Sequence, residues 1–347
     1  MDLYNQIGVM TMKRTVIRGT GRHLPPRVVT NEDMTQWMDT SDEWIQQRTG
    51  IQQRHWVPEE GGVGSSDLGL AASQIAMQRA GWKPEDLDLI IFATLSPDIF
   101  FPGPGCLIQH KLGLDATPAL DIRQQCTGFL YGITTADAYI RSNLANRILL
   151  VGAEVHSTGL DISTRGRDVA VIFGDGAGAV CLEGVESDEP VGVLASALHA
   201  NGKYAESLST ELGASRNNPR MSKEGIDEGR HYPKMDGKTI FKLAVQKLPE
   251  VVGEALAKAE LALEDIDLFI PHQANLRINQ FFQQSMKLPE DKVFHNIQRY
   301  GNTTAASIPI AFDEALEMGV IGSGSTVMFL GLGAGVTWGA VISKLVS

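Results

Sequence analysis

The alternation of apolar and polar residues along the chain predicts helices that are followed by short, buried strands. Residues 75–91 combine an amphipathic helical pattern with a short acidic turn, which leads into the apolar run 89–93. Residues 254–270 repeat the same order of helix, acidic turn and strand. An apolar run of this length between polar segments is typical of a strand that is buried on both faces. The pattern therefore predicts an α/β protein.

These two segments are also related in sequence, which indicates an internal duplication. They align at an offset of 179 residues and are identical at seven of seventeen positions. Farther along the chain, a helix that begins near Cys126 and the apolar strand 148–152 parallel a helix that follows Asn302 and the strand 327–331. The offset between Cys126 and Asn302 is 176, which agrees with the first offset of 179 if a small deletion is allowed. Chance is a poor explanation for two such units in the same order.

The duplication predicts two related α/β halves, residues 13–185 and 186–347, each with a mainly buried sheet. Residues 207–237 are polar and show no clear period. This is typical either of a long functional loop or flap, or of plain surface decoration. Residues 1–12 precede the first predicted strand, and we expect them to form a loose extension, with Met12 as an alternative start.

The composition excludes several functional classes. Of the 347 residues, 43% are hydrophobic and 20% are charged, which is ordinary for a soluble globular protein. The net charge of −11 argues against non-specific binding of nucleic acid, which needs a basic surface. The apolar runs are too short to cross a bilayer, and the first ten residues lack the pattern of a signal peptide. Three scattered cysteines fit a reducing compartment, so we expect a cytoplasmic protein without a nucleic-acid or membrane partner.

Cys126 is the first candidate for chemistry, because it lies where a short apolar strand meets a helix. The unpaired N–H groups at the start of a helix favour a thiolate, so we expect the pKa of this thiol to be lowered. The same N–H groups can hold the oxyanion that forms when a thiolate attacks a thioester. The alternative is that Cys126 is only a small buried hydrophobic residue.

His272 and Asn302 are the second and third candidates. His272 follows the apolar strand 266–270, at the end where open α/β sheets place reacting groups, and Asn302 precedes a helix predicted over residues 303–317. Taken singly, they could be a satisfied core histidine and a helix N-cap. Taken with Cys126, they supply a nucleophile and two hydrogen-bond donors, which suits chemistry that passes through a thioester enolate.

Together these segments resemble the three catalytic motifs of the 3-oxoacyl-acyl-carrier-protein synthase III family of thiolase-like condensing enzymes. The resemblance rests on Cys126, residues 272–277 and residues 301–308, and it extends from residues 16–21 to residues 333–339. It implies a duplicated, five-layered αβαβα thiolase-like fold with the site at the junction of the halves. It further implies catalysis by Cys126, His272 and Asn302, with the Cys126 and Gly335 N–H groups as the oxyanion hole.

The resemblance also implies the substrates and the partner. An acyl-CoA would load Cys126, and malonyl-acyl carrier protein would then enter and be condensed to a 3-oxoacyl product by a homodimeric enzyme. The coenzyme A thioester is a substrate, and no cofactor is implied. No metal is predicted either, because the eight histidines are too widely spaced for a metal motif. The runner-up is a secondary-metabolism relative that joins two acyl chains or transfers an acyl group to another nucleophile; a non-catalytic partner subunit is a third alternative.

Further residues are assigned by the same resemblance. Trp44 and Arg48 lie four residues apart and therefore share a helix face, where they would clamp the adenine of coenzyme A; a plain surface cation–π pair is the alternative. Arg167 would contact the nucleotide end of coenzyme A, and Asn275 would line the pantetheine tunnel. Phe101 would lie at the dimer interface and bound the acyl pocket, and Lys242 and Arg277 would dock the carrier protein. The chain departs from the common family pattern at residues 125–127, where a small residue often precedes the cysteine, and this leaves the starter acyl group open.

Overall fold

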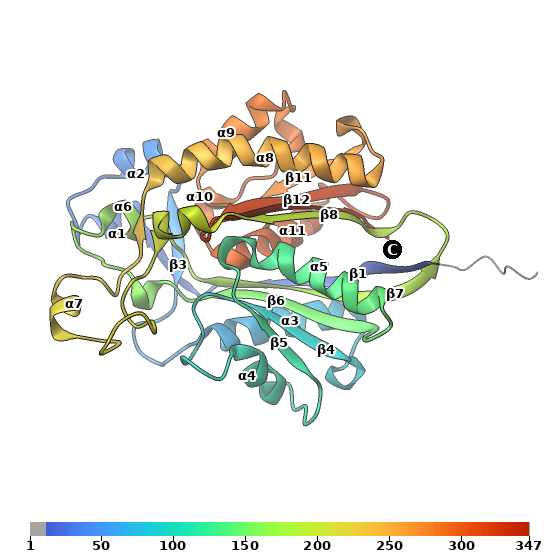
Figure 1. The fold of residues 1–347 in the computed structure, drawn as a ribbon, viewed down its shortest axis with the longest axis horizontal. Coiled ribbons are helices and arrows are strands. Elements are labelled where there is room, and N and C mark those ends of the chain that lie inside the picture. The colour runs from blue at the N-terminus through green and yellow to red at the C-terminus, as the bar shows by residue number, and fades with distance from the viewer. Residues whose placement is uncertain (1–11, 347) are drawn as a thin grey trace, which may run out of the picture.

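Two β-sheets divide the protein into five layers of helices and strands (Figure 1). The structure is a computed structural model and describes residues 12–346. The five-layered α/β architecture that the resemblance implied is confirmed. The extension expected at the N-terminus lies outside the described residues, apart from Met12, which already belongs to the first strand.

The first sheet contains only strands from the N-terminal half of the chain. Its order is β1 (Met12–His23), β7 (Gly176–Ser187), β6 (Arg147–Glu154), β4 (Leu89–Ala93) and β5 (Ala119–Ile122). β4 pairs in parallel with β5 and β6, whereas β7 pairs antiparallel with β6 and β1. The outer face of this sheet is covered by α3 (Ser65–Ala80) and α4 (Pro104–Lys111) (Figure 1).

The second sheet is built from the C-terminal half. Its order is β11 (Leu268–Pro271), β12 (Thr326–Gly333), β13 (Thr337–Lys344) and β8 (Gly192–Ala200), with β11 and β12 parallel and the other pairs antiparallel. Its outer face carries α8 (Gly237–Ala259) and α9 (Leu276–Ser285) (Figure 1). The strand β7 ends at Ser187, two residues past the predicted boundary at residues 185 and 186, and apart from these two residues each sheet uses one side of that boundary, which itself stays a prediction.

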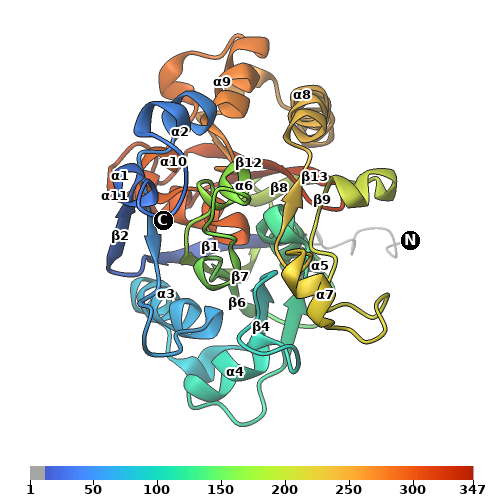
Figure 2. The same ribbon diagram turned by 90° about the vertical axis from the view of Figure 1, so that its left-hand side faces the viewer.

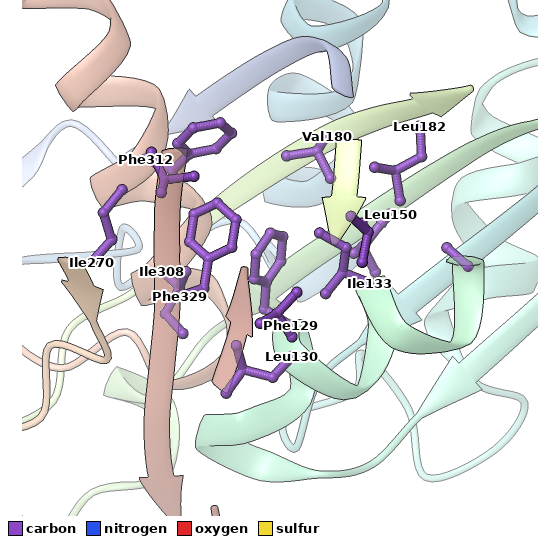
Figure 3. Packing of buried hydrophobic residues seen from close by; sticks show 14 of the residues in the cluster. Phe129, Leu130, Ile133, Leu150, Val180, Leu182, Ile270, Ile308, Phe312 and Phe329 are labelled. Atoms are coloured by element: carbon purple, nitrogen blue, oxygen red, sulfur yellow. The ribbon is translucent and has the colours of Figure 1, made fainter. Parts of the chain in front are cut away.

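The middle layer consists of α5 (Gly128–Arg141) and α11 (Ser307–Glu317), which are packed between the sheets (Figures 1 and 3). Here Phe329 of β12 is the shared partner of two aromatic contacts. Its ring centre lies 5.6 Å from that of Phe129 on α5 and 5.0 Å from that of Phe312 on α11, both close to edge-on. All three rings are buried, so apolar burial and ring packing hold both helices to the second sheet.

The duplicated units have the same local structure, and their backbone conformations correct the predicted alignment of Cys126 with Asn302. α3 and α8 both end in a left-handed residue, Gly81 and Glu260, and each is followed by a short 3-10 turn and a buried strand. The turns that precede α5 and α11 each begin with a left-handed residue, Gln125 (φ 45°) and Thr304 (φ 49°), which are 179 residues apart. The offset of 176 was therefore wrong: the backbone counterpart of Cys126 is Ala305, not Asn302.

Smaller elements cluster at the end of the molecule that faces the viewer in Figure 2. They include α1 (Asn31–Met34), α2 (Asp42–Thr49), α6 (Arg167–Ala170), α10 (Ile297–Tyr300) and the strand pair β2 (Arg27–Thr30) and β3 (Gln53–Trp56). The polar segment 207–237 also lies at this end. It contains α7 (Lys223–Asp227) and a two-stranded sheet of β9 (Leu208–Ser209) and β10 (Lys234–Met235), and we call it the flap.

Replacing Phe329 by Ala is expected to lower the free energy of unfolding by about 3–5 kcal/mol, because it removes a buried ring and leaves a cavity between α5 and α11. The change is measured as a shift in the midpoint of chemical denaturation. Leu144→Ala is the control, since the Leu144 side chain is 73% exposed and its removal should leave the midpoint nearly unchanged. Equal shifts in the two variants would contradict the role given to this ring.

Candidate active site

Cys126 lies in a 3-10 turn, residues Gln125–Thr127, directly before α5, and its side chain is buried. The turn packs against the end of β12. A Cβ atom placed on Gly333 would lie 2.5 Å from Cys126 Cβ and 3.1 Å from its sulfur, so only glycine fits there without displacing the cysteine. The left-handed backbone of the preceding Gln125 is a strained conformation for a residue with a side chain.

Two backbone N–H groups donate hydrogen bonds to the Cys126 sulfur, namely its own and that of Ala334. Backbone N–H groups beside a nucleophilic sulfur are of the kind that can also donate to an oxyanion on a carbon bound to it. The expected second donor, Gly335, is the next residue along the chain and lines the same cavity as Cys126. The assignment of Gly335 stays a prediction, and Ala334 N–H is the group seen to contact the sulfur.

The expected lowering of the thiol pKa is wrong. Burial and the negative charge of Glu154 raise the pKa of Cys126 to about 12, and the N–H groups of Ala334 and Cys126 offset only part of this rise. Glu154 is itself fully buried. Burial raises its pKa to about 7, although it accepts hydrogen bonds from Thr94 and Ser96. The N–H groups at the helix start stabilise the thiolate, but burial of the sulfur away from water destabilises it by more.

His272 follows β11 immediately, as predicted, and its ring is held by Ser307. His272 Nδ1 lies 2.5 Å from Ser307 Oγ, while the backbone N–H of Gln273 donates to the same oxygen. Since Ser307 Oγ already accepts from Gln273, its hydroxyl proton is available for Nδ1, which places the ring proton on Nε2. His272 Nε2 is buried and has no partner among the described residues. Burial lowers the pKa of this histidine to about 3, so the ring is neutral at physiological pH.

Asn302 is fixed by backbone pairing with the other half of the chain. Its N–H donates to Ile172 O at 2.9 Å, and its carbonyl accepts from Gly174 N at 3.1 Å, in a bridge with Phe173. Its side-chain oxygen accepts from Thr304 N–H at 2.8 Å. Because the oxygen is used in this way, the amide Nδ2 group is oriented as the free donor of the side chain.

A tunnel leads from the surface to these three residues. An outer space of about 470 Å³ is lined by Trp44, Arg48 and Arg277, and a narrower space of about 90 Å³ is lined by Cys126, His272 and Asn302. The two spaces share wall residues, which connects them: Ile172, Met235, Gly237, Phe241 and Asn275. The structure therefore brings the three catalytic candidates together at the inner end of one tunnel.

The predicted adenine clamp is closed in this structure. The Arg48 guanidinium lies 4.2 Å from the centre of the Trp44 ring, which leaves no space for a third planar group between them. Arg167 also approaches the ring, at 4.9 Å, and donates to Asp39 O. Asn275 lines the tunnel, caps α9 and donates to Arg48 O at 2.9 Å. An adenine can stack on Trp44 only after Arg48 or Arg167 has moved.

Two other predicted residues lie away from the tunnel wall. Phe101 is 78% exposed, next to the exposed side chains of Ile99 and Phe100. Lys242 is exposed on α8, one residue after Phe241 of the tunnel wall. Their roles in dimerisation and docking stay predictions.

Four further residues lie at this site without having been assigned a role from the sequence: Glu154, Ser307, Gly333 and Ala334. The signal for Ser307 was present, because it belongs to the segment 301–308 that follows Asn302. Gly333 and Ala334 belong to the glycine-rich run from which Gly335 was chosen. Glu154 ends an apolar strand in sequence, and nothing local indicates that its carboxylate lies near the cysteine.

Among residues 12–346, no group of three or more His, Cys, Asp or Glu side chains is placed to hold a metal ion. No helix within the same range is both long and apolar enough to cross a membrane.

Gly333→Ala is expected to slow acylation of Cys126 by an acyl-CoA by about 10²-fold, because the added methyl group displaces the sulfur from its N–H donors. The rate is followed by intact-mass analysis, together with the melting temperature. Gly322→Ala is the matched control, since a Cβ at Gly322 meets no atom within 4 Å. A Gly333→Ala enzyme that is acylated at the normal rate would show that this contact does not position the sulfur.

Glu154→Gln is expected to lower the pKa of Cys126, because it removes the negative charge that disfavours the thiolate. The pKa is measured from the pH dependence of alkylation by iodoacetamide, in a Cys106→Ser background that removes the exposed thiol. The difference from the parent should be largest above pH 7, where Glu154 is ionised, and should shrink below it. Glu183→Gln is the control, since Glu183 does not influence this thiol. A pKa unchanged by Glu154→Gln would contradict the proposed coupling.

Comparison with known proteins identifies the family. A family model described as 3-oxoacyl-[acyl-carrier-protein] synthase III matches residues 120–202, and the corresponding C-terminal model matches residues 256–345. The 3-oxoacyl-[acyl-carrier-protein] synthase III structure from Aquifex aeolicus is 40% identical, with a TM-score of 0.85, and covers 95% of this chain and 99% of that one. The Thermus thermophilus synthase III is 38% identical, with coverage of 95% and 98% and a TM-score of 0.86.

A third similar structure is the priming β-ketosynthase of the R1128 polyketide biosynthetic pathway. It is 30% identical, covers 99% of both chains and has a TM-score of 0.87. The chain therefore belongs to the 3-oxoacyl-[acyl-carrier-protein] synthase III family of acyl-transferring condensing enzymes with a thiolase-like fold.

Proposed function

We propose that this protein loads an acyl group from an acyl-CoA onto Cys126 and condenses it with malonyl-acyl carrier protein to initiate fatty acid synthesis. The observation that carries the proposal is the convergence of Cys126, the unpartnered Nε2 of His272 and Asn302 at the inner end of one tunnel. A nucleophile and two donors at one point match the needs of a reaction that passes through an acyl-enzyme and an enolate.

In the first half-reaction, the Cys126 thiolate attacks the carbonyl carbon of the acyl-CoA. A carbon–sulfur bond to Cys126 forms, the bond to coenzyme A breaks, and the proton lost by Cys126 ends on the departing thiol. The Cys126 and Ala334 N–H groups stabilise first the thiolate and then the oxyanion of the tetrahedral intermediate. We assign the remaining donor position to Gly335, which borders the same cavity.

In the second half-reaction, the malonyl thioester loses carbon dioxide, and the electron pair of the broken carbon–carbon bond moves into a thioester enolate. His272 Nε2–H and the Asn302 amide donate hydrogen bonds to the enolate oxygen. The neutral state of His272 suits this role, because it acts as a hydrogen-bond donor and not as an acid. The enolate carbon then attacks the acyl-Cys126 carbonyl, forms the new carbon–carbon bond and expels the Cys126 thiolate. The two thioesters carry the activation, so the steps call for no cofactor.

The outer tunnel suits coenzyme A, since Arg48, Lys238 and Arg277 outnumber the one carboxylate, Asp168, in its wall beside the Trp44 ring. We propose that the adenine stacks on Trp44 with Arg48 and Arg167, and that Asn275 contacts the pantetheine arm. Lys242 and Arg277, both exposed, are proposed to dock the carrier protein, whose acidic surface a local positive patch can attract despite the net charge of −11.

We also propose that the protein is a homodimer in which the exposed apolar loop containing Ile99, Phe100 and Phe101 is covered by a second copy. Neighbouring exposed aromatic and aliphatic side chains are typical of an interface.

A second candidate is a secondary-metabolism role in which another nucleophile or a second acyl chain replaces the malonyl group. The polar side chains around Cys126, including Gln125 and His156, favour it over a purely apolar starter pocket. Activity with malonyl-acyl carrier protein decides between the two functions.

The test of the proposed function separates its half-reactions. Cys126→Ala is expected to abolish both the acyl-enzyme and the condensation product. His272→Ala and Asn302→Ala should largely spare acylation, since neither side chain hydrogen-bonds to the Cys126 sulfur, but should lower malonyl decarboxylation by at least about 10²-fold through loss of an enolate donor. Intact-mass analysis and carbon dioxide release are the measurements. Loss of acylation in His272→Ala as complete as in Cys126→Ala would overturn this division of roles.

Trp44→Ala and Arg167→Ala are each expected to raise the KM for acyl-CoA while changing the reaction of the same acyl group on a short pantetheine thioester very little. The pantetheine thioester lacks the adenine, so it does not use the clamp. The comparison of the two donors is made in each variant by steady-state kinetics. Equal losses with both donors would show that the cation–π cluster serves folding instead.

A further inference from the structure

A second cavity shares Cys126, Phe173 and Leu208 with the wall of the tunnel and has an unusual charge. Its volume is about 620 Å³, and its wall includes Cys126, Ala334 and Gly335 together with residues of the flap. Among the described residues that line it, Arg123 is the only arginine or lysine, and none is Asp or Glu. A carboxylate-free wall with one guanidinium is notable in a protein whose net charge is −11.

Arg123 stands directly between the end of β5 and the turn that holds Cys126. It is exposed, and no described residue forms a hydrogen bond or ion pair with its guanidinium. Many other arginines near the middle of the chain are engaged, such as Arg141 with Asp137 and Arg147 with Glu183. A planar guanidinium without a partner in a cavity wall is suited to bind a carboxylate through two parallel hydrogen bonds.

His231 reaches the same cavity from a different part of the chain. It belongs to the flap, lines this cavity, and its ring lies against Tyr232 with centres 3.9 Å apart. Arg123 and His231 thus offer two polar contacts from the β5–α5 connection and from the flap.

The rest of the wall suits a short hydrocarbon chain. Leu95, Val155 and Leu160 contribute apolar surface, and the volume is ordinary for a small-molecule pocket. The inner end of the tunnel differs, since the space lined by His272 and Asn302 includes no lysine or arginine among the described residues. An acyl chain that keeps a negative charge therefore fits the second cavity. It does not fit the inner end of the tunnel, where the malonyl carboxylate is lost.

We propose that the acyl group carried by Cys126 is a short dicarboxylic acyl chain, whose terminal carboxylate binds Arg123 and His231. The proposal rests on the proposed function, because it specifies the thioester substrate of the first half-reaction. The chemistry of that half-reaction is unchanged: the thioester carbonyl is attacked by Cys126, coenzyme A leaves, and the distal carboxylate remains ionised and bound.

The experiment compares acyl-CoA pairs of equal length that differ only in a terminal carboxylate: succinyl-CoA against butyryl-CoA, and glutaryl-CoA against pentanoyl-CoA. The initial rate of adduct formation on the full-length protein is measured by intact mass. The dicarboxylic member of a pair should react at least about tenfold faster, as expected for a charge-assisted hydrogen-bonded pair. Arg123→Leu should lower this ratio about tenfold and leave the rate with the apolar member nearly unchanged, whereas Arg123→Lys should retain part of the preference.

His231→Phe keeps a ring beside Tyr232 and should also reduce the preference. Arg141→Leu, on α5 and outside the cavity, is the matched control and should leave the ratio unchanged. Apolar acyl groups that load as fast as dicarboxylic ones, with a ratio insensitive to Arg123→Leu, would overturn this inference and leave the proposed function standing. Absence of any Cys126 adduct from all four thioesters in the folded protein would overturn both.

Discussion

The two halves of the protein are joined by a pair of crossed contacts in which only glycine fits. A Cβ on Gly333 of β12 would lie 2.5 Å from Cys126 Cβ, and a Cβ on Gly152 of β6 would lie 2.5 Å from Ala305 O. Each turn that begins a middle-layer helix therefore rests on the central strand of the other half's sheet. The position of the sulfur depends on this close approach, because the residue directly after this strand supplies the Ala334 N–H group.

Much of the fold could be predicted from the sequence, because the repeated unit is specified locally. The amphipathic helix, the acidic turn and the buried strand follow one another within seventeen residues in both copies. In both turns a side-chain carboxylate, from Asp86 and Asp265, accepts a hydrogen bond from the backbone three residues earlier. Such short-range signals survive without knowledge of the rest of the chain. The flap lacks them, and its two short strands could not be predicted from its polar sequence.

The site was predictable in its residue types but not in its environment. Cys126, His272 and Asn302 could be found because each lies at the end of an apolar strand or the start of a helix. Their surroundings come from distant segments: Asn302 is held by residues near Phe173, and the charge that opposes the Cys126 thiolate comes from Glu154. The burial of Cys126 depends on how all the layers pack together. A prediction from the helix start alone therefore gave the wrong direction for the shift of the thiol pKa.

The position of Glu154 distinguishes the two repeated turns from each other. Glu154 is 179 residues before Gly333, so the two occupy equivalent places in the repeats. Where Gly333 leaves room for the sulfur, Glu154 extends a carboxylate that accepts from the N–H groups of Leu95, Ser96 and Ala305. Ala305 is the counterpart of Cys126. The N–H group of Ala305 in the second turn thus donates to a side chain of the protein itself, whereas the N–H group of Cys126 in the first turn faces the sulfur.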